Sequence, residues 1–368
     1  MLAVVFAHRS VRRRLSLNWD DCESVKLSGI SKKLISGITV AAVVLSIVGC
    51  AQGAQSTFGL EKKEPVSGTD FVLNTVATVT LYDKGDESLI NETFSLCRDY
   101  ENIFSASIDT SDVGRINAAD GEAVEVSDDT IELLQTAVHY AELTDGAFDV
   151  TIYPVSKLWD FTSGYGKVPD SGKITDALKH VDYHCIEINA DEKKVRLTDP
   201  DAEIDLGGIA KGYIADKLKE FLISKGVGSA IINLGGNVIT IGKNPNGNPF
   251  KIGIQKPFGE SNEVLFPVES EGTSVVSSGP YERFFEQDGK FYFHILDTAT
   301  GYPSESKLNG VTIISQYSVD GDALSTSCFI LGPEKGADLV RAVNEEKGLT
   351  GTEDEIRVFF IDKDNQVL

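Results

Sequence analysis

The chain has 368 residues, of which 41% are hydrophobic and 24% charged, so it can bury the core of one large domain or two modest ones and is not globally disordered. Its formal net charge of −22 is unevenly distributed: residues 1–50 carry seven basic and three acidic side chains, and the remainder carries 27 basic and 53 acidic ones. A body this acidic repels nucleic-acid phosphates, so no nucleic acid is expected as a partner. The acidic excess suits divalent cations, but a solubilising surface accounts for it more simply.

The first fifty residues have the pattern of an export signal. A basic stretch, Ser31-Lys32-Lys33, is followed by a mostly apolar run over residues 34–48 that ends at Gly49-Cys50. This run is shorter than the ~20 residues that span a bilayer as a helix. The pattern resembles a bacterial lipoprotein signal, which implies cleavage before Cys50 and lipid (diacylglycerol and palmitate) on the mature chain. The alternative is a plain membrane anchor with an incidental cysteine.

We therefore expect residues 1–49 to be a signal segment, residues 50–65 a lipid-anchored tether and residues 66–368 the functional domain, at the extracytoplasmic face of a bacterial plasma membrane. About thirty residues precede the basic pair, which is long for such a signal, and Met1 is the only methionine. We hypothesise that translation starts near Leu27 and that residues 1–26 are a mis-called start. The N-terminal sequence of the unprocessed precursor tests this hypothesis.

Hydrophobic periodicity predicts both helices and strands along the body of the chain. A run of β-branched residues over 71–82 indicates the first strand, and helical spacing follows over 88–104. A second helix is capped by Ser127 and closes before Gly146, and a third spans 209–225. Beyond it the pattern predicts strands at 229–234, 238–241, 251–255 and 311–315, hairpins turning at 288–289 and 363–365, and helices at 322–331 and 334–344.

No linker or repeat divides residues 66–368, so we expect one mixed α+β domain. The five cysteines have no zinc-ligand spacing. Cys97 and Cys185 lie near apolar residues and are expected to be small core residues, with a disulfide between them left open.

A glycine-rich segment, residues 205–213 (DLGGIAKGY), opens the third predicted helix. Glycines let the backbone approach a ligand, and the free N–H groups of a helix start attract anions. Lys211 adds a mobile cation that suits a phosphate. The segment is neither of the common phosphate-binding and dinucleotide-binding glycine motifs, so a structural turn stays open as the alternative.

Two further turns are candidates for ligand contact. Gly235-Gly236 ends a predicted strand and is either a plain hairpin or a place where the backbone approaches a flat ring or a pyrophosphate. Residues 144–149 (TDGAFD) follow a helix end and are either a C-capping turn or a segment that brings Phe148 and Asp149 to a site.

Two polar groups can carry chemistry. His294 follows an aromatic strand, with Asp297 as its expected partner, and is either structural or in contact with the ligand. Asp322 and Thr326 lie four residues apart at a predicted helix start, so their oxygens share one face. A carboxylate and a hydroxyl suit Mg²⁺, with phosphate and water completing its shell. Helix capping by Asp322 is the alternative.

Taken in order, these segments resemble the ApbE family, the FAD:protein FMN transferases. The resemblance covers roughly residues 71–344 and runs through the motifs DGAFDVTIYPVSKLW, IDLGGIAKGYIADK, AIINLGGNV, SSGPYERFF, FHILDTATGYP and DGDALSTSCFILG. It implies a T-fold-like α+β domain with mixed and antiparallel sheets and packed helices. It also implies an Mg²⁺-dependent enzyme that cleaves FAD, transfers FMN to a Thr or Ser hydroxyl of a partner redox protein, and releases AMP.

The resemblance implies roles for individual residues. Metal ligands are expected at Asp322, at Thr326 and at the backbone oxygen of Gly208. Catalytic roles are expected for Asp322, Lys211 and His294, the last deprotonating the acceptor hydroxyl or holding the pyrophosphate. Flavin contacts are expected at Leu73, Ser107, Ala147, Phe148, Asp149, Asp205, Lys211, His294 and Ile295.

The chain departs from the family pattern at several positions, and the family's DPxTG motif appears here as residues 297–301 (DTATG). Leu73 stands where the family often has Met, Ser107 where a Tyr is common, and Pro280 where an acidic or polar residue is usual. The Ser107 change puts a stacking contact in doubt, but no metal or phosphate group is lost. Two rival functions stay open: an FAD pyrophosphatase in which water replaces the acceptor hydroxyl, and a flavin-binding lipoprotein without catalysis.

Overall fold

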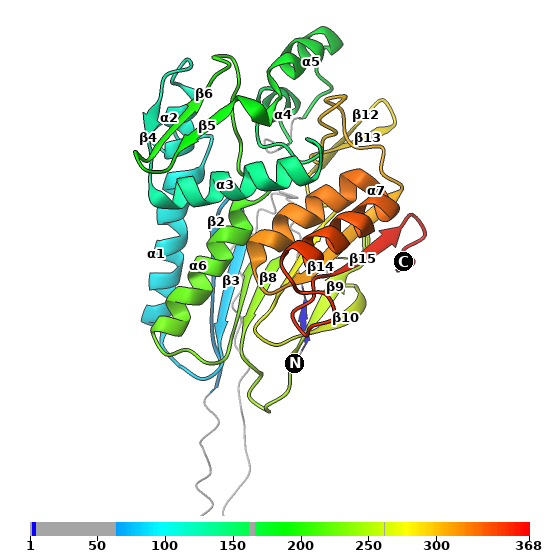
Figure 1. The fold of residues 1–368 in the computed structure, drawn as a ribbon. Helices are drawn as coiled ribbons and strands as arrows, with labels where there is room; N and C mark the ends of the chain where they lie inside the picture. Colours follow the sequence, from blue (N-terminus) through cyan, green and yellow to red (C-terminus); the bar gives the residue numbers. More distant parts are fainter. Residues whose placement is uncertain (1, 5–63, 162–165, 261) are drawn as a thin grey trace, which may run out of the picture. The chain divides into compact units, whose positions relative to one another are not determined.

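The computed structural model describes residues 2–4, 64–161, 166–260 and 262–368, to which the description below is confined (Figure 1). Apart from residues 2–4, the predicted signal segment lies outside these ranges, as do most of the tether and the lipidation residue Cys50. Among the described residues, none of the helices combines the length and the apolar character that a membrane span requires.

A seven-stranded antiparallel sheet forms the centre of the fold. Its strand order is β15-β14-β11-β8-β7-β3-β2, and every neighbouring pair is antiparallel. The strands are β2 (Val66–Val72), β3 (Thr75–Leu81), β7 (Ala230–Leu234), β8 (Asn237–Ile241), β11 (Ser274–Ser278), β14 (Leu308–Ser315) and β15 (Arg357–Asp362). Strand β14 is buried at all eight positions because both faces of the sheet are covered.

Three helices cover one face of this sheet: α1 (Glu87–Phe104), α6 (Ala210–Ser224) and α7 (Ser318–Glu346) (Figure 1). On the other face lie β9 (Phe250–Gln255) and β10 (Val264–Ser270), and β1 (Leu2–Val4) pairs in parallel with β9. Successive side chains of a strand point to opposite faces of the sheet, so alternate residues pack in the two hydrophobic cores on either side of it. Ile232 packs in the core under the helices, and Ile231 packs in the core between the sheets.

The remaining elements lie between β3 and β7 in the sequence. They are α2 (Asp112–Asn117), β4 (Val124–Glu125), α3 (Asp128–Leu143), α4 (Tyr153–Trp159), α5 (Ser171–Ala177), β5 (Ile186–Asn189) and β6 (Lys194–Leu197). A hairpin of β12 (Phe284–Gln287) and β13 (Lys290–Phe293) packs beside them, where Phe285 and Tyr292 contact the buried Trp159. Helices and antiparallel sheets in one α+β fold confirm the predicted fold class.

Two predictions about the elements need correction. The predicted strand over 71–82 is a hairpin, because β2 and β3 reverse at Leu73-Asn74, both with φ of 54°. The sequence hides this turn because leucine rarely adopts positive φ. The two helices predicted at 322–331 and 334–344 are both present, but they form the halves of α7, which begins at Ser318 and breaks at Gly332 with φ of 79°.

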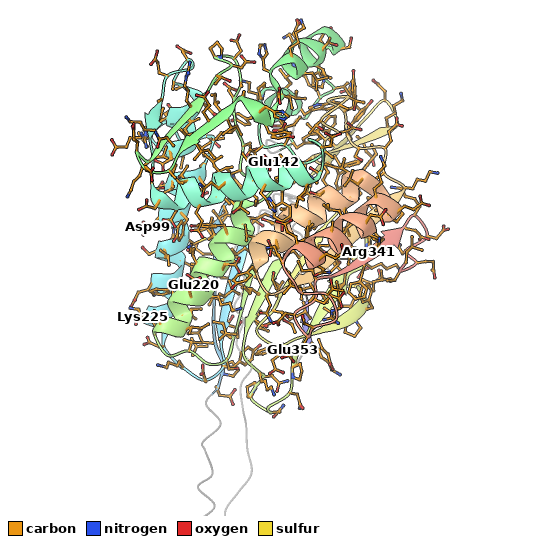
Figure 2. All side chains as sticks on the ribbon, in the orientation of Figure 1. Asp99, Glu142, Glu220, Lys225, Arg341 and Glu353 are labelled. Atoms are coloured by element: carbon orange, nitrogen blue, oxygen red, sulfur yellow. The ribbon has the colours of Figure 1, made fainter. Side chains whose placement is uncertain are left out.

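The free cysteines Cys97, Cys185 and Cys328 are all buried, so the Cys97–Cys185 disulfide that the sequence left open does not form. Both residues belong to the main core, as predicted. Many charged residues lie on the outside: Asp99, Glu142, Glu220 and Glu353, labelled in Figure 2, are exposed. Solvated carboxylates of this kind account for an acidic composition without a bound cation.

Candidate active site

The candidate site lies where the first turns of α6 and α7 meet. The Gly212 N–H of α6 donates to the Asp322 carboxylate of α7 at 2.8 Å (Oδ2). A Cβ atom at position 212 would lie 2.3 Å from the Ser318 carbonyl oxygen, so only glycine lets the two helices come this close. The contact joins the glycine-rich segment to the predicted metal-binding segment, which the sequence treats as separate.

Asp322 is placed to bind a ligand. Helix α7 begins after Tyr317, so Asp322 lies inside the helix and the alternative that it caps the helix is wrong. The side chain is 5% exposed. Among the described residues, neither its second oxygen nor the Thr326 hydroxyl has a hydrogen bond, whereas Oδ2 is fixed by Gly212. Two hard oxygens therefore stay available on one face of α7.

The glycine turn before α6 carries Gly208 and Asp205. The Asp205 carboxylate accepts a hydrogen bond from Gly207 N–H at 2.8 Å, and burial raises the pKa of Asp205. A Cβ at Gly208 would be 3.4 Å from the Phe148 ring, so the buried Phe148 packs directly on this turn. Gly208 is four residues before Gly212, which places its backbone close to the start of α6.

Lys211, Glu282 and Arg283 give the site a charged wall. Burial raises the pKa of Glu282 to about 6, while Lys211 and Arg283 lower it and Asp322 raises it further. Neither cation forms a salt bridge with a carboxylate among the described residues. Sequence reasoning singled out neither Glu282 nor Arg283. Their signal in the sequence is weak: two ionisable residues directly before Phe284-Phe285 at the start of β12.

His294 follows β13 and lies in the field of the same two cations. Burial, together with the nearby Arg283 and Lys211 cations, lowers its pKa to about 3. Its backbone N–H donates to Arg283 O at 3.1 Å, and its Nδ1 atom is buried without a hydrogen-bond partner. The imidazole is therefore neutral at neutral pH and can accept a proton once an anion offsets the cations.

The predicted pairing of His294 with Asp297 is wrong. The Asp297 carboxylate accepts the Ala299 N–H at 2.8 Å, and its backbone N–H donates to Tyr302 O at 2.8 Å. Asp297 therefore shapes its own turn. Short polar side chains often bond to the backbone two residues ahead, and the sequence alone did not separate this use from a partnership with His294.

His294 predicts an acid-dependent loss of stability. Its pKa is about 3 in the folded protein and about 6.5 in the unfolded chain. Between these values the unfolded chain binds the additional proton, so this contribution is complete above pH 6.5 and is lost as the pH falls towards 3. At pH 5.5 the loss is about 1.4 kcal/mol in the free energy of unfolding.

Urea unfolding of wild type and of His294→Gln at pH 7.5 and 5.5 measures this loss. The variant is expected to lose less stability on acidification than the wild type. Equal losses in wild type and His294→Gln would contradict the assignment.

The segment 144–149 is tied to the turn that follows His294. The Thr298 hydroxyl donates to Gly146 O at 2.7 Å, which holds Ala147 and Phe148 beside that turn. Asp149 is 7% exposed, and its carboxylate accepts the Thr151 N–H and the Tyr183 N–H at 2.8 and 2.9 Å. It therefore shapes the wall of the site from within, and a flavin contact there stays a prediction.

Leu73 lies at one end of the central sheet, next to the second glycine turn. A Cβ at Gly235 would lie 2.0 Å from Thr75 Oγ1, so the turn at Leu73-Asn74 and the turn at Gly235-Gly236 are side by side. A bulky residue at positive φ costs roughly 1–2 kcal/mol, and such strain concentrates at functional positions. The positive φ of Leu73 is consistent with its predicted flavin contact, which stays a prediction.

The other two predicted flavin contacts differ in their surroundings. Ile295 is 5% exposed and its carbonyl accepts the Ser304 N–H at 2.9 Å, next to His294. Ser107 is exposed in the loop after α1, and its hydroxyl lies 3.5 Å from that of Ser105. None of the contacts described here joins Ser107 to the other predicted site residues.

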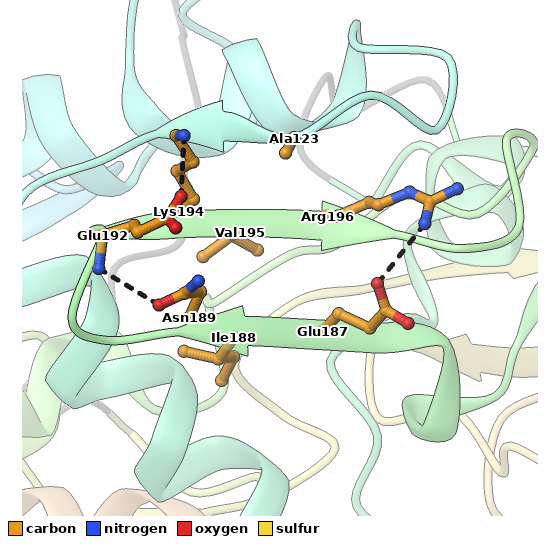
Figure 3. Close-up of a pocket in the computed structure, with 8 residues that line it drawn as sticks. All are labelled: Ala123, Glu187, Ile188, Asn189, Glu192, Lys194, Val195 and Arg196. Atoms are coloured by element: carbon orange, nitrogen blue, oxygen red, sulfur yellow. Dashed lines mark hydrogen bonds and ion pairs between the residues drawn. The ribbon is translucent and has the colours of Figure 1, made fainter.

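Two other polar features lie outside this site. A hollow on the β4-β6-β5 sheet is lined by charged side chains that pair with one another, including Glu187 with Arg196 at 3.5 Å and Glu192 with Lys194 at 2.8 Å (Figure 3). His180, Asp199 and Asp201 approach one another closely enough to share an ion, but His180 already bonds to Asp199 at 2.8 Å. Neither feature includes a predicted site residue.

Comparison with known proteins agrees with this geometry. The model of the ApbE family matches residues 73–349. The chain is 40% identical over 257 residues to an FAD:protein FMN transferase of Klebsiella pneumoniae, covering 70% of this chain and 79% of that protein. It is 33% identical over 316 residues to an FAD:protein FMN transferase of Treponema pallidum, covering 81% and 87%.

Solved structures give the same result. The ApbE protein of Thermotoga maritima superposes with a TM-score of 0.74 at 30% identity, covering 83% of this chain and 96% of that one. The flavinyl transferase ApbE of Pseudomonas stutzeri, in its apo form, superposes with a TM-score of 0.69 at 30% identity, covering 83% and 93%. On motifs, fold and both comparisons, this chain belongs to the ApbE family.

Proposed function

We propose that this protein transfers FMN from FAD to a Thr or Ser hydroxyl of a partner redox protein and releases AMP. One observation carries the proposal: the buried Asp322 carboxylate is fixed by the Gly212 N–H one residue from Lys211, so a metal ligand and a phosphate-binding cation share one helix junction. FAD:protein FMN transferases of other bacteria, similar over most of their length, support it.

The donor set fits Mg²⁺. The carboxylate of Asp322, the hydroxyl of Thr326 and the backbone carbonyl of Gly208 are hard oxygen ligands, and the remaining positions suit phosphate oxygens and water. The second Asp322 oxygen and the Thr326 hydroxyl have no hydrogen bond among the described residues, so binding an ion there breaks no existing bond. When bound, Mg²⁺ would neutralise charge on the pyrophosphate.

The protein's own residues supply the remaining functions. Lys211 and Arg283 attract the pyrophosphate and neutralise part of its charge, since phosphoryl transfer depends on positioning and electrostatics. The acceptor hydroxyl oxygen bonds to the phosphorus of the FMN phosphate, and the bond from that phosphorus to the bridging oxygen breaks, so that AMP leaves with the bridging oxygen. His294 accepts the hydroxyl proton, because the anionic substrate offsets the cations that hold the imidazole pKa low.

Nucleotide analysis with and without an acceptor tests the reaction. Purified protein, FAD and Mg²⁺ are incubated with a partner that carries an acceptor Thr, or with its Thr→Ala variant, and AMP and free FMN are measured. We expect AMP without free FMN when the intact acceptor is present. Equal amounts of AMP and free FMN, independent of the acceptor Thr, would instead identify an FAD pyrophosphatase.

We also propose that the mature protein is held at the extracytoplasmic face of the plasma membrane through lipid on Cys50. The basic, apolar and small-residue pattern before Cys50 supports this anchor. A Cys50→Ser variant is expected to leave the membrane fraction if it is cleaved, and to lose metabolically incorporated palmitate. A cleaved variant that stays membrane-bound would contradict the anchor.

A further inference from the structure

We infer that Asp216 is a positioning residue: it caps α7 from the neighbouring helix α6 and thereby sets Asp322 for metal binding. The inference rests on the proposed function of the α6–α7 site. Asp216 does not belong to the predicted metal, phosphate or flavin set, and it lies on α6 one turn beyond Gly212.

The Asp216 carboxylate holds the first two N–H groups of α7. Its Oδ1 accepts from Ser318 N–H at 2.8 Å and its Oδ2 from Val319 N–H at 2.9 Å. The first N–H groups of a helix have no partner within the helix and carry the positive end of its dipole. A carboxylate with one oxygen on each is thus a bidentate cap supplied by another helix.

Helix α7 has no cap of its own. Tyr317 occupies the capping position, and its side chain makes no capping hydrogen bond. The Ser318 hydroxyl is used elsewhere, because it donates to Asn237 Oδ1 at 2.6 Å and accepts from the Ser274 hydroxyl at 2.8 Å. The buried start of α7 therefore depends on Asp216 for these bonds.

Two parallel contacts lock α7 against α6. Asp216 binds the N–H groups of Ser318 and Val319, and one turn away Gly212 N–H binds Asp322. Two anchors spaced by a turn on each helix fix both the rotation and the sliding of α7. If the first anchor is lost, Gly212 N–H to Asp322 is the one hydrogen bond among the described residues that still joins the two helices, so Asp322 can shift relative to the glycine turn.

Helix α7 is also anchored by contacts that do not involve α6. Asp320 accepts hydrogen bonds from the Tyr140 hydroxyl at 2.6 Å and from Lys347 Nζ at 2.7 Å, which tie it to α3 and to the far end of α7. Loss of the Asp216 cap is therefore expected to disturb the first turn without unfolding the helix. A variant that lacks the cap can therefore show whether Asp216 positions Asp322 or only stabilises the fold.

The test measures metal binding directly. Mn²⁺ binding to the full-length protein without FAD is followed by calorimetry for wild type, Asp216→Ala and Asp216→Asn, and the Mg²⁺ concentration for half-maximal transfer and kcat are measured alongside. In Asp216→Ala we expect the dissociation constant for Mn²⁺ and the Mg²⁺ concentration for half-maximal transfer each to rise at least about tenfold. We expect kcat at saturating Mg²⁺ to stay within about threefold of wild type. Asp216→Asn keeps one acceptor oxygen, so its metal affinity is expected to lie between those of wild type and Asp216→Ala.

Asp170→Ala is the matched control. Asp170 caps its own helix α5 with one oxygen: Oδ1 accepts from Gly172 N–H at 2.9 Å and from Lys173 N–H at 3.3 Å. Both alanine variants are expected to lower the melting temperature by a few degrees, since a lost cap costs ~1 kcal/mol. Only Asp216→Ala should weaken Mn²⁺ binding.

Wild-type Mn²⁺ affinity in Asp216→Ala would overturn the inference and leave Asp216 as a stabilising cap only. If Asp216→Ala does not fold, Asp216→Asn decides by the same criterion. Absence of FMN transfer by the wild-type protein would overturn the proposed function instead, and the Mn²⁺ comparison would still decide the role of Asp216.

Discussion

Replacing Asp322 with alanine is expected to lower the rate of Mg²⁺-dependent FMN transfer by at least about a thousandfold, while the protein stays folded. The substitution removes the only carboxylate of the proposed metal set. It also leaves the Gly212 N–H without its acceptor, which costs about 1–3 kcal/mol in the free energy of unfolding. Activity at saturating Mg²⁺ and circular dichroism melting are the two measurements.

Two companion variants separate chemistry from stability. Asp322→Asn keeps an oxygen for the Gly212 N–H but removes the charge, so it is expected to melt close to wild type and still lack activity. Asp338→Ala changes an exposed carboxylate on the same helix, which pairs with Arg341, and should change neither property. Transfer by Asp322→Asn at more than a tenth of the wild-type rate would contradict a metal-binding role for Asp322.

Gly212→Ala is expected to destabilise the protein by about 3 kcal/mol or more, although alanine is favoured over glycine in a helix by about 1 kcal/mol. The added Cβ would lie 2.3 Å from Ser318 O and 2.7 Å from the Val319 Cα. These are backbone atoms, which cannot rotate away, so the overlap outweighs the gain in helix propensity. Urea unfolding gives the free energy directly.

Gly172→Ala is the control for helix propensity, because the nearest atom to its Cβ is a side-chain oxygen of Asp170 at 3.0 Å. It is expected to change the free energy of unfolding by less than about 1 kcal/mol. A Gly212→Ala protein as stable as wild type would show that α6 and α7 can separate without cost. Such a result would remove the steric basis of the proposed site.

The helices were predictable where local signals are strong. The helix predicted at 88–104 is α1, and Ser127 caps α3 as expected, accepting the Thr130 N–H at 3.2 Å. Gly332-Pro333 separates the two halves of α7, as their turn chemistry indicates. These features depend on residues within one or two helical turns of each other, so the local sequence is enough to predict them.

The elements that were missed depend on distant contacts. The short strands β5 (IEIN) and β6 (KVRL) alternate apolar and polar residues, but over only four positions each, and β6 pairs with the more distant β4 as well as with β5. The Leu73-Asn74 turn lacks the glycine that normally marks positive φ. At the Leu73-Asn74 turn, tertiary packing outweighs the local preference of leucine.

The site residues also divide into those with a local sequence signal and those that depend on distant contacts. Asp322 and Thr326 were recognisable because both lie on one helix face, and Lys211 because it follows a glycine turn. The bond between Gly212 and Asp322 joins residues 110 positions apart, and no periodicity reports it. Asp216 reads in the sequence as an ordinary polar helix residue, and only its contact with the start of α7 reveals a different role.

The most direct test of the account is the intact mass of an acceptor protein after incubation with FAD, Mg²⁺ and this protein. We predict a gain of one FMN less one water on the acceptor Thr or Ser. The gain should be abolished by chelating the metal, by Asp322→Asn and by Thr→Ala in the acceptor. An unmodified acceptor in the presence of complete FAD cleavage, or a gain that persists in Asp322→Asn, would contradict the assignment of FMN transfer to the α6–α7 site.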